Sequence, residues 1–200
     1  MIKIIGAGAL GGPIAIHLLR LGLPFEIYDF DVVEDKNLNN QVYEQAHIGL
    51  TKVEALEEIC TRIDPILAKM CKFVNQKITK REIKDWDDTV FMAVDKISLR
   101  KEFATNLTRA KFVIDGRLGA KSGRILGFKR YQFRDYLDTC FDEENIASES
   151  ECSTVKDLAF VAAQLASYAM VMFKLAFTPG EVNDIIYSVY NLEIDSFKWD

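Results

Sequence analysis

The first thirty residues carry groups whose types and spacing suit the binding of a nucleotide. Gly6, Gly8 and Gly11 form a G-x-G-x-x-G pattern, and the acidic residue Asp29 follows at the distance typical of a ribose ligand. Gly6 permits a tight turn, Gly8 lets the backbone approach a phosphate, and Gly11 allows close packing of a helix. Free N–H groups at a helix N-terminus favour negative charge. We therefore expect a ribose hydroxyl at Asp29 and phosphates at Gly6, Gly8, Ala9, Leu10 and Gly11.

The elements around these residues are those that such a site needs. An apolar run at 2–5 indicates a buried strand, helical spacing indicates a helix over about 10–21, and residues 25–28 indicate a second strand that ends at Asp29. This order of strand, glycine loop, helix and strand makes an otherwise weak glycine pattern informative. The alternative for Asp29 is a surface acid at the end of a strand.

Another acidic residue follows a later strand. The apolar segment 89–94 predicts a buried strand that ends at Asp95, and ligands of open parallel sheets bind beyond the carboxyl ends of the strands. We expect Asp29, Asp31 and Asp95 to converge there with the glycine loop, where a carboxylate can hold Mg²⁺. The alternative for Asp95 is a cap for a helix predicted over about 97–109.

The rest of the chain indicates further helices and strands. Lys52 would lie in the first turn of a helix predicted over about 50–63, from which its ammonium could reach phosphates; the alternative is a solvated lysine. Residues 133–150 are aromatic and then acidic, which predicts a loop. The remaining predicted elements are strands at 72–75, 111–114, 125–131 and 192–199, and a short helix at 79–86 with a capping box from Thr79 to Glu82.

This alternation predicts an α/β fold: a Rossmann-like, doubly wound and mainly parallel sheet with flanking helices and a C-terminal antiparallel extension. Two hundred residues suit a single domain, 1–200. The apolar stretch at 158–177 approaches the length of a membrane span, but polar residues including Lys174 interrupt it. We expect instead a long helix buried in the core or in a dimer interface.

Composition excludes several classes of function. A net charge of −5 argues against binding to nucleic acid or to an anionic membrane. The four cysteines include no C-x-x-C pair, which argues against structural zinc and against a disulfide framework. Because the glycine loop begins at residue 6, we expect no signal peptide. A cytoplasmic protein is the simplest expectation.

Three segments together resemble a known family. Residues 29–41, DFDVVEDKNLNNQ, resemble the D-x-D-x-V-x-x-x-N-L-x-R-Q segment of the ThiF/MoeB family, the ubiquitin-activating-type adenylyltransferases. Residues 49–52, GLTK, are similar to its G-x-x-K, and residues 93–100, AVDKISLR, to its T-D-N-x-x-x-R. The resemblance covers most of the chain. It implies ATP, Mg²⁺ and adenylation of the C-terminal carboxylate of a ubiquitin-like or sulfur-carrier protein, and we expect a homodimer.

The resemblance also implies roles for single residues. Asp95 matches the family's magnesium ligand, Lys52 would offset charge on the phosphates, and Asn37 and Gln41 would hold phosphate or ribose oxygens. Asn40 stands where the family has arginine, and asparagine lacks both the charge and the bidentate fork. In larger members the dimer partner contributes another arginine. The candidates to compensate, among which the sequence does not choose, are Arg20, Arg100 and Arg117.

One cysteine is a candidate nucleophile. Residues 152–156, CSTVK, resemble the C-T-x-K context of the thioester-forming cysteine of ubiquitin-activating enzymes, and a helix N-terminus can favour the thiolate. The alternative for Cys152 is a helix-entry cysteine without chemistry. Cys60 and Cys71 fit the core, and Cys140 is a weaker nucleophile or redox candidate in the predicted loop.

Three hypotheses about function follow. The first is an adenylating enzyme that acts on a carboxylate-ended protein or peptide. The second is a noncatalytic, nucleotide-binding scaffold, for which Asn40 is the main support. The third is an NAD(P)-dependent oxidoreductase, which the glycine pattern and Asp29 alone would allow; Lys52 and Asp95 separate the first from the third.

Overall fold

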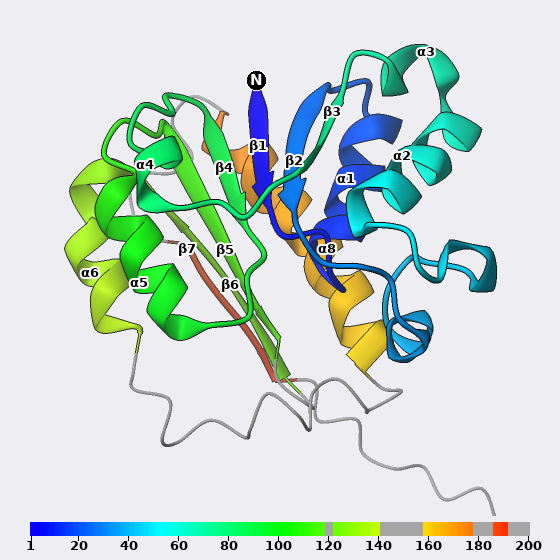
Figure 1. The fold of residues 1–200 in the computed structure, drawn as a ribbon. Coiled ribbons are helices and arrows are strands. Elements are labelled where there is room, and N and C mark those ends of the chain that lie inside the picture. The colour runs from blue at the N-terminus through cyan, green and yellow to red at the C-terminus, as the bar shows by residue number, and fades with distance from the viewer. Residues whose placement is uncertain (119–121, 141–157, 178–185, 192–200) are drawn as a thin grey trace, which may run out of the picture.

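A computed structural model describes residues 1–118, 122–140, 158–177 and 186–191. Its centre is a seven-stranded sheet in the order β3-β2-β1-β4-β5-β6-β7 (Figure 1). The neighbouring strands β3–β2, β2–β1, β1–β4 and β4–β5 are parallel, and the β5–β6 and β6–β7 pairs are antiparallel. The predicted fold class, with its antiparallel extension, is confirmed. The strands are β1 (Ile2–Ile5), β2 (Phe25–Asp29), β3 (Lys72–Asn75), β4 (Thr89–Met92), β5 (Phe112–Leu118), β6 (Ser122–Phe128) and β7 (Ile186–Asn191).

Helices cover both faces of the sheet. On one face lie α1, α2 and α8, and on the other lie α4, α5 and α6 (Figure 1). Each face has its own apolar core: Ile14 and Leu56 belong to the first, and Ile83, Phe103 and Tyr136 to the second. The helices are α1 (Gly11–Arg20), α2 (Lys52–Ile63), α3 (Pro65–Ala68), α4 (Lys80–Ile83), α5 (Ile97–Asn106), α6 (Phe133–Asp138) and α8 (Leu158–Ala176), with short 3-10 turns η1 (Asp35–Asn39), η2 (Gln45–His47) and η3 (Arg130–Gln132).

The long helix α8 packs on α1, β5 and β6. Gly123 and Gly127 of β6 make this close approach possible, because a Cβ at either position would overlap Leu165 or Met172. The prediction of a long helix buried in the core is therefore confirmed. Among the described residues, no helix is both long enough and apolar enough to cross a membrane.

The structure corrects the predicted loop at 133–150. Residues 133–138 form α6, because Phe133, Tyr136 and Leu137 have helical spacing and pack on the second core. The helical path also continues past Asp64 as α3. The strand predicted at 192–199 lies outside the described residues. The capping box from Thr79 to Glu82 is confirmed at the start of α4.

A buried ionic cluster lies on the second face. Glu26 of β2 accepts hydrogen bonds from Lys3, from Lys72 and from the Tyr28 hydroxyl. Burial by itself raises the pKa of Glu26, but these three hydrogen bonds outweigh it and hold the pKa at about 2. The carboxylate therefore stabilises the fold only while it is ionised.

We expect this cluster to make folding stability depend on pH. Because the folded pKa of Glu26 lies below its value of 4.5 in the unfolded chain, its contribution is complete above about pH 5 and is lost as the pH falls towards 2. Glu26→Gln should lower the free energy of unfolding at pH 7 by about 2–3 kcal/mol, and the difference from wild type should shrink between pH 5 and pH 2. Urea unfolding at several pH values measures this, with the exposed Glu57→Gln as the control. If Glu26→Gln lowers the free energy of unfolding equally at pH 7 and pH 2.5, the prediction is wrong.

Candidate functional site

The glycine loop joins β1 to α1 at the carboxyl edge of the sheet. Gly6 has φ +96°, and a Cβ there would lie 2.5 Å from the carbonyl oxygen of Ala93. A Cβ at Gly11 would overlap the Gly6 carbonyl, whereas a Cβ at Gly8 would meet nothing within 4 Å. In the described part of the chain, the N–H groups of Gly8, Ala9 and Leu10 donate to no other backbone group. The loop therefore presents open space and unused donors, as an anion site requires.

Asp29 closes this loop from the end of β2. Its Oδ2 atom accepts the Ala7 N–H at 2.6 Å, and its Oδ1 atom accepts the Asp31 N–H at 2.8 Å. The side chain is largely buried, which excludes the alternative of a surface acid. Each carboxylate oxygen keeps a second lone pair. Ribose binding by Asp29 stays a prediction, and what the structure establishes is its hold on the loop.

Lys52 and Asp31 form an ion pair beside this loop. Lys52 Nζ lies 2.7 Å from Asp31 Oδ2, and the two side chains are 10% and 49% exposed. The Lys52 N–H also donates to the Asp31 carbonyl at 2.9 Å. Lys52 is therefore a mostly covered, paired cation, which excludes the alternative of a freely solvated lysine. Its contact with a phosphate stays a prediction.

The three predicted amide side chains lie on and after η1. Asn37 is buried, and its Oδ1 atom accepts the Glu34 N–H at 2.8 Å, so this oxygen is committed to the turn. Asn40, also buried, is the C-terminal cap residue of η1. Gln41 differs from Asn37, because its Oε1 atom is buried and has no hydrogen-bond partner among the described residues. A buried unpaired acceptor costs about 1–3 kcal/mol, and a ribose hydroxyl is the kind of donor that would satisfy it.

Asp95 lies between β4 and α5 and is exposed to solvent. Its side chain makes no hydrogen bond or ion pair with any described residue. The N-cap residue of α5 is Lys96, so the alternative role of Asp95 as the helix cap is not seen. Among the described residues, no three His, Cys, Asp or Glu side chains are grouped to hold a metal. Mg²⁺ normally needs one or two carboxylates plus nucleotide phosphates, which fits an exposed Asp95 that has no partner among the described residues.

The loop that carries Asp95 is attached to the glycine loop. The Ala93 N–H donates to the Ile5 carbonyl at 2.9 Å, and the Ala93 carbonyl packs against Gly6. Arg100 of α5 donates to the Val94 carbonyl and so holds the same loop from the other side. The structure thus brings Asp29, Asp31, Lys52 and the Asp95 loop together with the glycine loop, as predicted for the edge of a parallel sheet.

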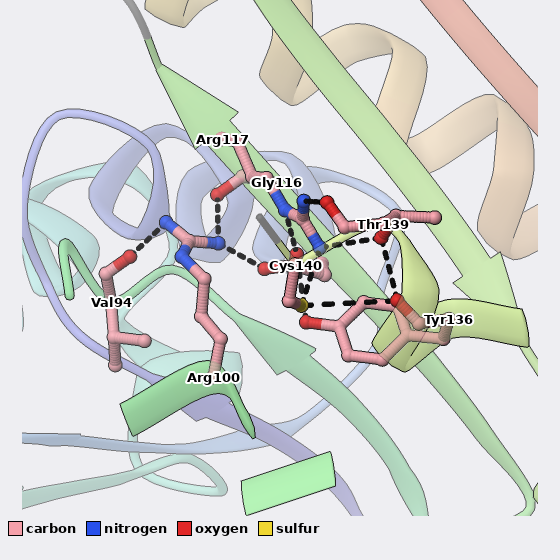
Figure 2. Close-up of polar contacts among 8 residues, drawn as sticks. Val94, Arg100, Gly116, Arg117, Tyr136, Thr139 and Cys140 are labelled. Atoms are coloured by element: carbon pink, nitrogen blue, oxygen red, sulfur yellow. Dashed lines mark hydrogen bonds and ion pairs between the residues drawn. The ribbon is translucent and has the colours of Figure 1, made fainter. Parts of the chain in front are cut away.

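Two of the three arginines considered as substitutes for the one missing at Asn40 are committed elsewhere, and the third lies at the far end of α1. Arg100 and Arg117 both pair with Asp115, which is fully buried. Arg117 also donates to the carbonyl of Thr139 at 2.8 Å (Figure 2). Arg20 ends α1, about 14 Å along the helix from its first residue. None of the three is placed to replace the arginine.

Sequence reasoning missed the role of Asp115. Asp115 is the central anion of a network, because Arg100, Arg117 and the Tyr136 hydroxyl all donate to its carboxylate. Figure 2 shows how these three donors lie relative to one another. Burial and the nearby Asp115 charge raise the pKa of Tyr136, so its hydroxyl remains a donor. The sequence did hold a signal for this network. Asp115 is an acidic residue at the end of an apolar run, and Arg117, two positions later, lies on the same face of the strand.

The cysteines fall into two groups. Cys60 and Cys71 are buried in the first core, as predicted. Cys140 is not in an exposed loop: it is 5% exposed, and Arg117 donates to its sulfur at 3.2 Å. Cys140 therefore belongs to the Asp115 network. Cys152, with its predicted thioester role, lies outside the described residues.

Fold and site together define a doubly wound α/β protein in which a glycine loop with unused backbone donors lies beside an acidic edge of the sheet. The sequence profile of the ThiF family matches residues 1–185, and the chain belongs to this family. The solved structure of Escherichia coli tRNA N6-threonylcarbamoyladenosine dehydratase, TcdA, in complex with AMP has the same fold. It aligns with a TM-score of 0.56 and 16% identity, over 86% of this chain and 87% of that chain.

Shorter similarities connect the chain to curated proteins. It is 35% identical over 68 residues to a probable adenylyltransferase/sulfurtransferase MoeZ of Mycobacterium tuberculosis, and 37% identical over 65 residues to adenylyltransferase and sulfurtransferase MOCS3-1 of Zea mays. It is 32% identical over 65 residues to ubiquitin-like modifier-activating enzyme 5 of Caenorhabditis elegans. These matches cover 32–33% of this chain and only 14–17% of the relatives' own lengths.

The open space at Gly8 predicts that a substitution there weakens ATP binding but leaves the folding stability nearly unchanged. Gly8→Ala should change the free energy of unfolding by less than about 0.5 kcal/mol, because the new methyl group meets no atom within 4 Å. ATP should bind about tenfold more weakly, because the methyl group occupies space that a phosphate needs. Gly11→Ala is the contrasting variant, expected to lose about 1–3 kcal/mol of stability through overlap with Gly6. Unchanged ATP affinity in the Gly8 variant would mean that the glycine loop is not part of the ATP-binding site.

Proposed function

We propose that this chain is an ATP-dependent adenylyltransferase that activates the C-terminal carboxylate of a ubiquitin-like or sulfur-carrier protein. The observation that carries the proposal is the grouping, at one sheet edge, of unused glycine-loop amides, the Lys52–Asp31 pair and Asp95, whose side chain has no partner among the described residues. Ligands of open α/β sheets bind at this edge. Membership of the ThiF family and similarity to proteins named as adenylyltransferases support the same reaction.

The proposed reaction needs positioning and charge stabilisation more than covalent help. A carboxylate oxygen of the carrier attacks the α-phosphorus of ATP, the bond to the pyrophosphate oxygen breaks, and an acyl adenylate and pyrophosphate form. The amides of Gly8 to Leu10 would bind phosphate oxygens, Gln41 would accept a hydrogen bond from the ribose, and Lys52 would offset developing charge. Asp95 would hold Mg²⁺, which neutralises part of the pyrophosphate charge.

A thioester step on Cys152 is a further part of the proposal. The thiolate would attack the acyl carbon of the adenylate, the bond to AMP would break, and AMP would leave with its electron pair. This step rests on the local resemblance of residues 152–156 alone. The predicted homodimer and cytoplasmic location likewise stay predictions.

A noncatalytic, nucleotide-binding scaffold is the second candidate. Two observations favour it: Asn40 stands where the family has arginine, and two of the candidate substitutes, Arg100 and Arg117, are paired with Asp115. The third hypothesis, an NAD(P)-dependent oxidoreductase, gains no support from the family match.

Calorimetric titration with ATP–Mg²⁺ and, separately, with NAD(H) tests the choice. The proposed function predicts binding of ATP–Mg²⁺ and no binding of NAD(H). Pyrophosphate exchange, assayed with candidate carrier proteins that end in a free carboxylate, then separates the enzyme from the scaffold. ATP binding without exchange for any carrier would favour the scaffold, and NAD binding without ATP binding would overturn both.

A further inference from the structure

Tyr43 reaches the glycine loop from a distant part of the chain. Its hydroxyl donates to the carbonyl oxygen of Ala7 at 2.6 Å, and both residues are buried. The Ala7 N–H in turn donates to Asp29 at 2.6 Å. Both polar backbone groups of Ala7 are therefore held, one by the end of β2 and the other by the segment between η1 and η2.

This contact controls the orientation of the next amide. The Ala7 carbonyl and the Gly8 N–H belong to one planar trans peptide unit, in which they point in opposite directions. A hydrogen bond to the carbonyl therefore fixes the direction of the N–H. Ala7 lies between two glycines, whose backbones resist rotation least, so this peptide needs an external restraint to keep a single orientation.

Tyr43 is itself held firmly enough to act as that restraint. Its ring meets the ring of His47 edge-on, with centroids 6.4 Å apart, and the Nδ1 atom of His47 accepts the Glu44 N–H at 2.9 Å. The neighbouring Val42 packs against Gly12 of α1. Burial, with Asp29 and Asp31 nearby, raises the pKa of the Tyr43 hydroxyl, so it stays protonated and keeps its donor.

We propose that Tyr43 is a positioning residue, which fixes the Ala7–Gly8 peptide so that the Gly8 N–H stays available to a phosphate. The inference rests on the proposed nucleotide function, but the restraint on the loop exists without ligand. Because Tyr43 closely follows Gln41, one segment would both contribute a side chain to the site and set the shape of the glycine loop. Tyr43 would touch neither the nucleotide nor the carrier.

Tyr43→Phe removes the hydroxyl and keeps the ring. In the ligand-free variant, the ¹⁵N order parameters of Gly8 and Ala9 should fall from about 0.85 towards 0.6, the range of flexible backbone. The Kd for ATP–Mg²⁺ should rise about five- to tenfold, the usual effect of losing one hydrogen bond. In pyrophosphate exchange the KM for ATP should rise similarly while kcat changes less than about twofold, because ordering the loop is required for binding.

Tyr28→Phe is the matched control. It also removes a hydroxyl hydrogen bond, to Glu26 at 2.7 Å, but Tyr28 packs on the second core and Tyr43 on the first. This control should leave both the loop order parameters and the Kd for ATP unchanged. Equal loss of ATP affinity in both variants would indicate general destabilisation and would overturn the proposal.

The remaining outcomes are also decisive. Unchanged order parameters in Tyr43→Phe would overturn the positioning role, whether ATP affinity falls or not. If wild type binds no ATP but the variant loosens Gly8 and Ala9, the restraint by Tyr43 is established and the proposed function fails. If the variant loosens the loop and weakens ATP binding, and Tyr28→Phe does neither, both proposals are supported.

Discussion

Asp95→Ala is expected to remove most of the effect of Mg²⁺ on ATP binding. Because Asp95 is the proposed protein ligand of the metal, its removal should make ATP–Mg²⁺ bind about 10- to 100-fold more weakly. When the variant is assayed with an identified carrier protein, its turnover should lie below detection. The melting temperature should stay within about 1–2 °C of wild type, because the side chain makes no hydrogen bond or ion pair with any described residue.

Calorimetry with and without Mg²⁺ measures this effect. Asp87→Ala, which removes another exposed aspartate close to β4 at the opposite end of that strand, should behave as wild type. If Asp95→Ala retains the full effect of Mg²⁺, the metal binds elsewhere. If instead ATP binding without metal falls equally, Asp95 acts on the fold or on the nucleotide and not on Mg²⁺.

Asp115→Asn is expected to have the largest effect on stability. Asparagine keeps the size of the side chain but leaves the Arg100 and Arg117 guanidinium groups, 4% and 14% exposed, without their counter-charge. Breaking a buried ion pair in this way costs about 3–5 kcal/mol. For a chain of this size the melting temperature should fall by about 10 °C.

Thermal and urea unfolding measure the loss. Asp138→Asn is the matched control, since it neutralises an exposed aspartate at the end of α6, which also carries Tyr136 of the network. The control should stay within about 0.5 kcal/mol of wild type. A loss below 1 kcal/mol in Asp115→Asn would mean that solvent or the remaining hydrogen bonds of the two arginines compensate for the charge.

Glu26→Gln and Asp115→Asn both remove a buried carboxylate that is held by two cations and a tyrosine hydroxyl, but at different places in the sheet. Glu26 is surrounded by lysines and a tyrosine at the side of the sheet, and its effect should vary with pH between 5 and 2. Asp115 joins β5 to α5 and α6, and through Arg100 it also holds the Val94 carbonyl beside Asp95. Loss of Asp115 should therefore disturb the candidate site as well as the core.

The sequence by itself determined the elements and the edge at which the site lies. Alternating strands and helices, the glycine pattern and the capping box at Thr79 depend on interactions between residues close in the chain, so local spacing predicts them. The rule that strand ends gather ligands then placed Asp29 and Asp95 at one edge. These predictions held because local geometry and parallel topology leave few alternatives.

Only the tertiary structure decided which polar groups are already engaged. Arg117 and Arg100 were open candidates in the sequence, and burial of Asp115 in β5 commits both to the core. The pairing of Lys52 with Asp31 and the hydrogen bond from Tyr43 to Ala7 join residues 21 and 36 positions apart. Such contacts depend on how distant segments pack and on which charges are removed from water. Neither of these leaves a periodic pattern in the local sequence, so the sequence does not predict them.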